Sequence, residues 1–230
     1  MLFSITSLWS EKKENAPEVV AILEKMTEAT GGADTIQSLK SLKTTSSAEM
    51  VGMGMKMNIT TISGENCAKL VTKMNGKVMM EQAYDGEIAW SKDMMMGTRV
   101  LSGAEALAVK QATLENTIDA TGFYDEIKVG KEKVFNGEKV IVLLCDKEGM
   151  DTSELYVGKD DYLLKGMLAT QESPQGKMKS EIICEAYKTS KSGMVYLSKS
   201  TIKMGPISMN IVVDSYSENI DLKEVSFKKP

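Results

Sequence analysis

Apolar and polar residues alternate with a period of two over much of residues 42–93. This alternation is typical of β-strands that bury one face of a sheet. Asn75 with Gly76, and Asp85 with Gly86, interrupt the pattern, and both dipeptides favour two-residue hairpin turns. The stretch therefore predicts the middle of an antiparallel meander. Its more apolar face carries Val78, Met80, Gln82 and Tyr84, followed after the second turn by Ile88 and Trp90.

The same period predicts further strands before and after this meander. Met53, Met55 and Met57 lie on one face of a strand, and Leu70 lies on one face of the next. After Gly122, turn signals recur at short intervals, which is typical of a sandwich or barrel-like sheet. We predict roughly ten or eleven strands in a mainly β (α+β) fold. The apolar runs of this second half are residues 140–145, 155–157, 162–170, 178–187, 194–204 and 207–216.

Three segments instead show helical spacing. The first begins with Asn15 as its N-cap, followed by Pro17 and Glu18, and ends at Gly31 and Gly32, because asparagine and proline favour the start of a helix and glycine favours its end. A short second helix holds Ile36. Both helices are amphipathic, so we expect them to cover an apolar surface. The apolar positions of the first two helices are Val19, Ile22, Leu23, Met26, Ala29, Ile36 and Leu39.

The third helix interrupts the strands near the centre of the chain. Ser102 and Glu105 have the spacing of a capping box, and Leu107 and Leu114 belong to the apolar stripe that follows. No linker is long enough to mark a domain boundary. We therefore predict a single domain over residues 15–230. Residues 1–14 are interpreted as a disordered leader or the remnant of a truncated signal, since they lack a basic region and a cleavage site.

Composition argues against several classes of function. The net charge of −4 and scattered lysines give no electrostatic footprint for nucleic acid. The 230 residues contain no histidine, which removes the commonest general base and metal ligand. No nucleophile elbow, phosphate-binding loop, dinucleotide fingerprint or zinc-protease motif occurs. We expect a protein without catalytic residues or cofactor.

Sulfur-containing residues leave alternatives open. The three cysteines, Cys67, Cys145 and Cys184, lie far apart within apolar segments, as buried thiols do, and one disulfide between two of them stays open. The 18 methionines suit either a core or a surface that repacks around variable apolar ligands. Residues 53–57 and 94–96 also offer thioethers that bind Cu(I), although no histidine or paired cysteine is near them.

Arg99 is the only arginine in the chain. It lies between the methionine triplet at 94–96 and the central helix. Arginine suits bidentate contacts with carboxylates and phosphates. Arg99 is therefore a candidate for contact with a ligand headgroup or for locking the helix as a lid, and a plain surface charge is the alternative.

Several segments together resemble a known family. They are EATGG after the first helix, SLKSLKTT, the strand VGMGMKM, EQAYDGEIAW and MGTRVLSGAE before the central helix. Over residues 17–227, the chain resembles the outer-membrane lipoprotein-sorting (LolA/LolB-like) superfamily. The resemblance implies a strongly curved antiparallel half-barrel whose concave face is covered by helices. It also implies a periplasmic or cell-envelope location.

The resemblance implies a non-enzymatic carrier or binder of lipid, acyl chains or lipoprotein, a monomer in peripheral or transient contact with membranes. A docking module for an envelope protein is the alternative, and a methionine-based Cu(I) binder is the third hypothesis. The alternation of residues between the two faces of each strand, together with the resemblance, assigns an apolar cavity lining. The candidate lining residues are Met53, Met55, Met57, Leu70, Met80, Tyr84, Trp90, Leu107 and Leu114.

Overall fold

The computed structural model describes residues 15–119, 121–173 and 176–230, so the predicted leader at 1–14 lies outside the described residues. Fourteen strands form one sheet in which every neighbouring pair is antiparallel. The strands are β1 (Ser41–Met50), β2 (Met55–Gly64), β3 (Cys67–Met74), β4 (Lys77–Tyr84), β5 (Ala89–Asp93), β6 (Gly97–Val100), β7 (Glu126–Val129), β8 (Lys133–Phe135), β9 (Glu138–Asp146), β10 (Ser153–Gly158), β11 (Leu164–Ser173), β12 (Gly176–Thr189), β13 (Val195–Met204) and β14 (Ile207–Glu218).

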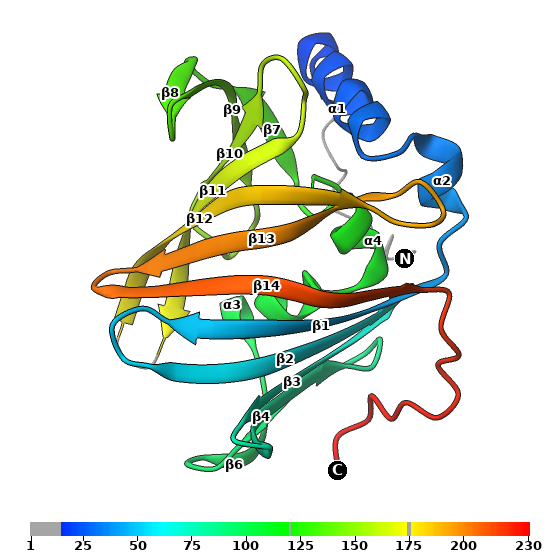
Figure 1. Ribbon diagram of the computed structural model, residues 1–230, viewed down its shortest axis with the longest axis vertical. Coiled ribbons are helices and arrows are strands. Elements are labelled where there is room, and N and C mark those ends of the chain that lie inside the picture. Colours follow the sequence, from blue (N-terminus) through cyan, green and yellow to red (C-terminus); the bar gives the residue numbers. More distant parts are fainter. Residues whose placement is uncertain (1–14, 120, 174–175) are drawn as a thin grey trace, which may run out of the picture.

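The strand order is β6-β5-β4-β3-β2-β1-β14-β13-β12-β11-β10-β9-β7, with β8 also paired to β9. Two meanders therefore meet where β1 pairs with β14 (Figure 1). Strands β6 and β7 do not pair with each other in this order, so the sheet is open. The mainly β antiparallel fold is confirmed, but the predicted strand number is too low. The short strands β6, β7 and β8 have only three or four residues each, too few to show a clear alternation.

Four helices accompany the sheet in the described part of the chain: α1 (Pro17–Ala29), α2 (Ala33–Gln37), α3 (Gly103–Lys110) and α4 (Leu114–Ile118). The prediction of three was wrong because residues 111–113 divide the central helix into α3 and α4. Among the described residues, no helix is both long and apolar enough to cross a membrane.

The helix caps also differ from the prediction. Asn15 does not cap α1, which begins at Pro17 after Ala16, without a side-chain cap. Ser102 precedes α3 but makes no capping hydrogen bond. The Glu105 carboxylate, which would form the other half of the capping box, accepts two hydrogen bonds from Arg99 instead.

All four helices pack on the same face of the sheet, which curves around α3 and α4 (Figure 1). Helix α1 packs with Val19 and Ile22 against β7, β9 and β10. Leu114 of α4 joins Leu42 of β1 in a second cluster. Val109 of α3 packs against β4 and β5 in a third. The helices and this face together form most of the core.

The opposite face of β3–β5 is covered by the segment after β14. The Trp90 indole donates a hydrogen bond to the Phe227 carbonyl over 2.7 Å, and the Lys69 ammonium donates to the Ser226 carbonyl over 2.9 Å. Trp90 is only 1% exposed. The C-terminal segment therefore completes the packing on the side that faces away from the helices.

The two predicted turns of the central meander differ. The β3–β4 connection is the expected two-residue turn, with Met74 paired to Lys77 and positive φ at Asn75 and Gly76. The β4–β5 connection is longer than predicted and spans residues 85–88. Its geometry is fixed by Asp85, whose carboxylate accepts hydrogen bonds from the amides of residues 87 and 88.

Candidate ligand cavity

A cavity of about 490 Å³ lies between the sheet and the helices α1, α2 and α4. Its lining is mostly apolar and comes from both meanders, since β1 and β10–β14 all contribute. Volumes of this size are common for small-molecule sites. The residues that line it are Leu23, Met26, Thr27, Thr30, Ala33, Ile36, Gln37, Leu42, Thr44, Thr117, Ile118, Asp119, Thr121, Leu155, Tyr162, Leu164, Tyr187, Met194, Val195, Tyr196, Leu197 and Tyr216.

The connection between α1 and α2 is fixed against the β12–β13 turn. The amide of Val195 donates a hydrogen bond to the Thr30 carbonyl over 3.0 Å. Gly31 has a φ of +120°, and a Cβ atom there would lie 2.7 Å from the Gly193 carbonyl oxygen. Only glycine fits this conformation and this close approach. The sequence EATGG thus sets the position of both helices over the cavity.

Four of the seven tyrosines line the cavity: Tyr162, Tyr187, Tyr196 and Tyr216. The rings of Tyr196 and Tyr216 stack with centroids 4.0 Å apart and planes 7° apart. Burial raises the pKa of Tyr187 and of Tyr216 far above the usual range. Both phenols are therefore neutral at physiological pH, and the cavity wall combines aromatic surface with uncharged hydroxyl groups.

Little charge faces the cavity. Among the described residues, Asp119 is the one ionisable lining residue besides the tyrosines. Its carboxylate accepts hydrogen bonds from the amide and hydroxyl of Thr121. Lys25 of α1 lies nearby, with its ammonium 3.0 Å from the Tyr162 hydroxyl and 4.7 Å from the ring centroid. The cavity interior is thus suited to uncharged, apolar groups.

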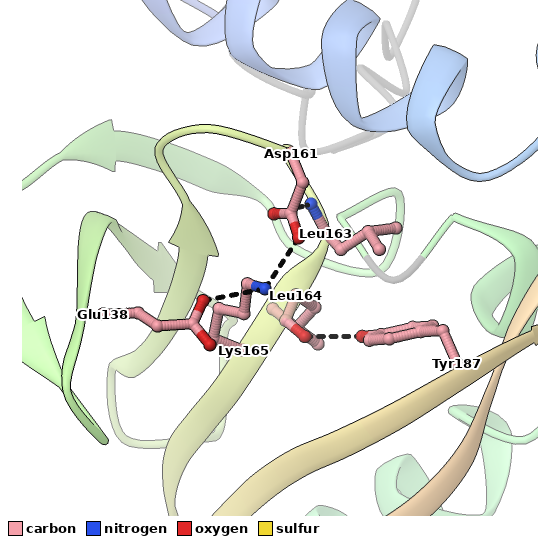
Figure 2. Close-up of polar contacts among 6 residues, drawn as sticks. All are labelled: Glu138, Asp161, Leu163, Leu164, Lys165 and Tyr187. Carbon is pink, nitrogen blue, oxygen red and sulfur yellow. Dashed lines mark hydrogen bonds and ion pairs between the residues drawn. The ribbon is translucent and has the colours of Figure 1, made fainter.

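The β10–β11 turn carries Tyr162 and leads into Leu164 at the start of β11. An ion-pair cluster holds this turn (Figure 2). The Lys165 ammonium lies 2.8 Å from the Glu138 carboxylate and 2.7 Å from that of Asp161. On the neighbouring strand, the Tyr187 hydroxyl donates a hydrogen bond to the Leu164 carbonyl. These contacts fix the part of the cavity wall that is formed by Tyr162, Leu164 and Tyr187.

None of the nine residues predicted from sequence is among the cavity-lining residues. Cross-strand register places five of them on the helix-covered face of the sheet with Leu42, but at other positions along it. Met53 lies in the exposed β1–β2 turn, with 57% of its surface accessible. The five residues on the helix-covered face are Met55, Met57, Leu70, Met80 and Tyr84.

Of the other three predicted residues, Trp90 and Leu114 are buried core residues and Leu107 is partly buried. Leu107 packs against the α1 cluster, and Leu114 belongs to the α4 cluster, next to the cavity wall. Trp90 pairs with Ala83, whereas Tyr84 pairs with Ala89, so Trp90 and Tyr84 face opposite sides of the sheet. Their assignment to one lining was wrong, because both faces of β5 are buried and its apolar pattern does not identify the helix-covered one.

Arg99 of β6 contacts α3 directly. Its guanidinium donates two hydrogen bonds of 2.7 Å to the Glu105 carboxylate. This bidentate contact lowers the pKa of Glu105 and raises that of Arg99. The contact joins β6 to α3, and the roles of Arg99 as a headgroup or lid contact stay predictions.

The cysteines are three free thiols. Burial raises the pKa of Cys145 to about 12 and that of Cys184 to about 11. Cys67 is less buried, and its pKa is also raised by burial. Thiols with such pKa values are poor nucleophiles at neutral pH.

The sequence pattern predicted part of the cavity lining. Leu23, Met26 and Ile36 belong to the helical stripes that predict a covered apolar surface. The cavity tyrosines had no such signal. Tyr187 lies next to register irregularities between β12 and β13, and Tyr162 lies in a turn with a positive φ of 55°.

No protein-family model matches the sequence, and no curated protein does. Solved structures do match the fold. A LolA superfamily protein from Nitrosomonas europaea aligns with a TM-score of 0.61 and 12% identity, over 91% of this chain and 97% of that chain. A DUF1329 family protein from Desulfovibrio piger aligns with a TM-score of 0.60 and 12% identity, over the same shares of the two chains.

A domain from Vibrio parahaemolyticus, named for outer membrane lipoprotein sorting, aligns with a TM-score of 0.57 and 13% identity, over 90% of this chain and 95% of that chain. At these identities the likeness concerns the fold alone. It extends over 90% or more of each chain. The chain therefore has the fold of the LolA superfamily and of this lipoprotein-sorting domain, as the resemblance in the sequence implied.

Proposed function

We propose that the protein is a non-enzymatic carrier or binder of lipid, acyl chains or lipoprotein in the periplasm or cell envelope. The observation that carries the proposal is the cavity of about 490 Å³ between the helices and the sheet. Its apolar lining and scarcity of charge suit hydrocarbon chains. The fold shared with a LolA superfamily protein and a lipoprotein-sorting domain supports the same class of function.

Burial of hydrocarbon supplies the affinity. Each methylene group transferred from water contributes about 0.8 kcal/mol, so about ten would contribute roughly 8 kcal/mol before the cost of ordering the chain. The hydroxyls of Tyr196 and Tyr216, which line the cavity, offer hydrogen bonds to an ester or amide at the end of such a chain. Helices α1 and α2 form one side of the cavity and would lie against the bound chain.

The test is native mass spectrometry of the purified protein, followed by organic extraction of bound material. We expect an acyl-containing species in roughly stoichiometric amount. M26E should abolish its retention, because Met26 lines the cavity and a carboxylate there would lose hydration next to bound hydrocarbon. V20E is the matched control, since Val20 is on the same helix but 40% exposed and absent from the lining.

Two results would overturn the proposal. One is a protein that stays free of ligand when phospholipids and acylated peptides are supplied. The other is M26E retaining as much ligand as V20E in samples whose thermal transitions show that both are folded. Recovery of a stable protein partner without lipid would favour the docking module instead.

A further inference from the structure

Exposed apolar side chains concentrate at one end of the sheet. The turns β1–β2, β3–β4 and β5–β6 lie side by side there, because the strands they join are consecutive in the sheet. We call residues 49–57, 73–79 and 92–97 the hairpin rim. Of the 13 exposed large apolar residues in the described part of the chain, seven belong to it: Val51, Met53, Met55, Val78, Met94, Met95 and Met96. The concentration at one end distinguishes the rim from ordinary scattered surface residues.

The tip of β5–β6 is held in a defined conformation. The Asp93 carboxylate accepts hydrogen bonds from the amides of Met95 and Met96 over 2.8 and 2.7 Å. Gly97 closes the turn with a φ of +68°. The turn leaves Met95 95% exposed and Met94 71% exposed. These methionines thus project from an ordered turn.

The rim is positively charged within an acidic protein. It contains four lysines and two carboxylates, which gives a net charge of +2 in a chain whose total is −4. All four lysines are exposed. They are Lys56, Lys73, Lys77 and Lys92, and at least one of them flanks each of the three turns.

We propose that the hairpin rim docks the protein onto the surface of a bilayer that contains anionic phospholipid. Methionine and valine at the tips would enter the boundary between headgroups and acyl chains, while the lysines contact the phosphates. A protein partner fits less well. The rim contains four lysines and no aromatic residue, whereas the cores of protein interfaces are enriched in aromatics and depleted in lysine.

The rim and the cavity lie at opposite ends of the sheet. The cavity uses Leu42 and Thr44 near the start of β1, and the rim includes Met50 at its end. Met50 lies eight positions after Leu42 on the strand, about 26 Å away at roughly 3.3 Å per residue. Figure 1 shows the β1–β2 turn at the end of the sheet away from α2. Docking through the rim therefore leaves the cavity and its helices uncovered by the membrane. The proposed membrane contact is a property separate from the proposed carrier function.

The test is co-sedimentation of the full chain with vesicles of phosphatidylglycerol, compared with vesicles of phosphatidylcholine. We expect preferential binding to phosphatidylglycerol that weakens as salt rises, because the Debye length is only about 10 Å at 0.1 M. The triple variant M94S/M95S/M96S should lower the binding constant by about tenfold or more. The matched control V20S/V134S/V212S removes three exposed apolar residues outside the rim and should bind as the unmodified protein does.

A second pair of variants tests the charge. K73E/K77E should weaken binding to phosphatidylglycerol, and K40E/K191E should have less effect, because Lys40 and Lys191 are exposed outside the rim. Thermal transitions and ligand content should be unchanged in all four variants. The proposal is overturned if the protein binds neither vesicle, or if rim and control variants bind equally. The proposal would also be overturned if the unmodified protein self-associates without binding vesicles and M94S/M95S/M96S abolishes this self-association. The rim would then be an interface between two copies of the chain.

Discussion

Gly31 and Gly32 are adjacent glycines that offer a test of how the helices are fixed over the cavity. Both have positive φ, +120° and +83°. A Cβ atom at Gly31 would lie 2.7 Å from the Gly193 carbonyl oxygen and 3.2 Å from the Met194 Cα, while one at Gly32 would meet nothing within 4 Å. Alanine at either position incurs a backbone cost, but only alanine at Gly31 also collides with backbone atoms that cannot rotate away.

The magnitudes follow from these two environments. G32A should destabilise the fold by about 1–2 kcal/mol, the cost of a left-handed conformation with a Cβ atom. G31A should lower the free energy of unfolding by about 3–5 kcal/mol. Backbone strain accounts for about 1–3 kcal/mol of this loss, and the rest comes from pushing two packed backbone segments apart. For a chain of this size, 1 kcal/mol corresponds to roughly 2–4 °C in Tm. The two variants should therefore differ by several degrees.

Thermal and urea unfolding of the two variants measure the difference directly. G31A should also lose bound ligand in its folded form, since Thr30 and Val195 both line the cavity and are joined by the hydrogen bond next to Gly31. Equal stabilities for G31A and G32A would refute the close approach between the α1–α2 connection and the β12–β13 turn.

Two further contacts give predictions of their own. R99M should cost about 1 kcal/mol of unfolding free energy, because both partners are about a third exposed and solvent screens the pair. The pKa of Glu105 is lowered in the fold. The stability contributed by the ion pair is therefore complete above the ordinary glutamate pKa of about 4.3 and is lost as the pH falls through the lower pKa of the folded state. The unfolding free energies of R99M and the unmodified protein, measured by urea titration, should converge in acid, and a difference that does not change with pH would contradict the pairing. W90F should cost about 2–3 kcal/mol, since it leaves the half-buried Phe227 carbonyl without its donor and reduces the packing of a side chain that is only 1% exposed. Hydrogen exchange should then rise in residues 222–228 before it rises in β5, and unchanged exchange would show that the indole does not hold the C-terminal segment.

Local patterns in the sequence were sufficient for much of the fold. The turn at Asn75 and Gly76 was predictable because it depends on the residues within it, and the same holds for the end of α1 at Ala29. The division of the central helix was not predictable in this way. Residues 111–113 lie where the Ser63 hydroxyl donates a hydrogen bond to the Ala112 carbonyl, a contact between segments distant in sequence.

The site was less predictable than the fold. Alternation places apolar residues on a face but does not say what covers it, and Trp90 is covered by the C-terminal segment rather than by a helix. Met53 satisfied the period of its strand, yet the turn at Gly52 and Gly54, both with positive φ, takes it out of the sheet. The cavity arises where α1, α2 and α4 leave part of the sheet uncovered, and that depends on helix placement, not on strand pattern.

The pairing of β1 with β14 has a consequence for how the chain is made. Each meander consists of neighbours in sequence, but this single ladder joins residues 42–50 to residues 209–218. During synthesis at roughly 5–20 residues per second, β1 has no partner on this side for about ten seconds or more. Throughout that interval an unpaired strand edge is open to wrong partners. The exposed lysine Lys43 and glutamate Glu49 on β1 are charges of the kind that discourage premature pairing, and a chain that lacks β14 would keep this edge permanently open.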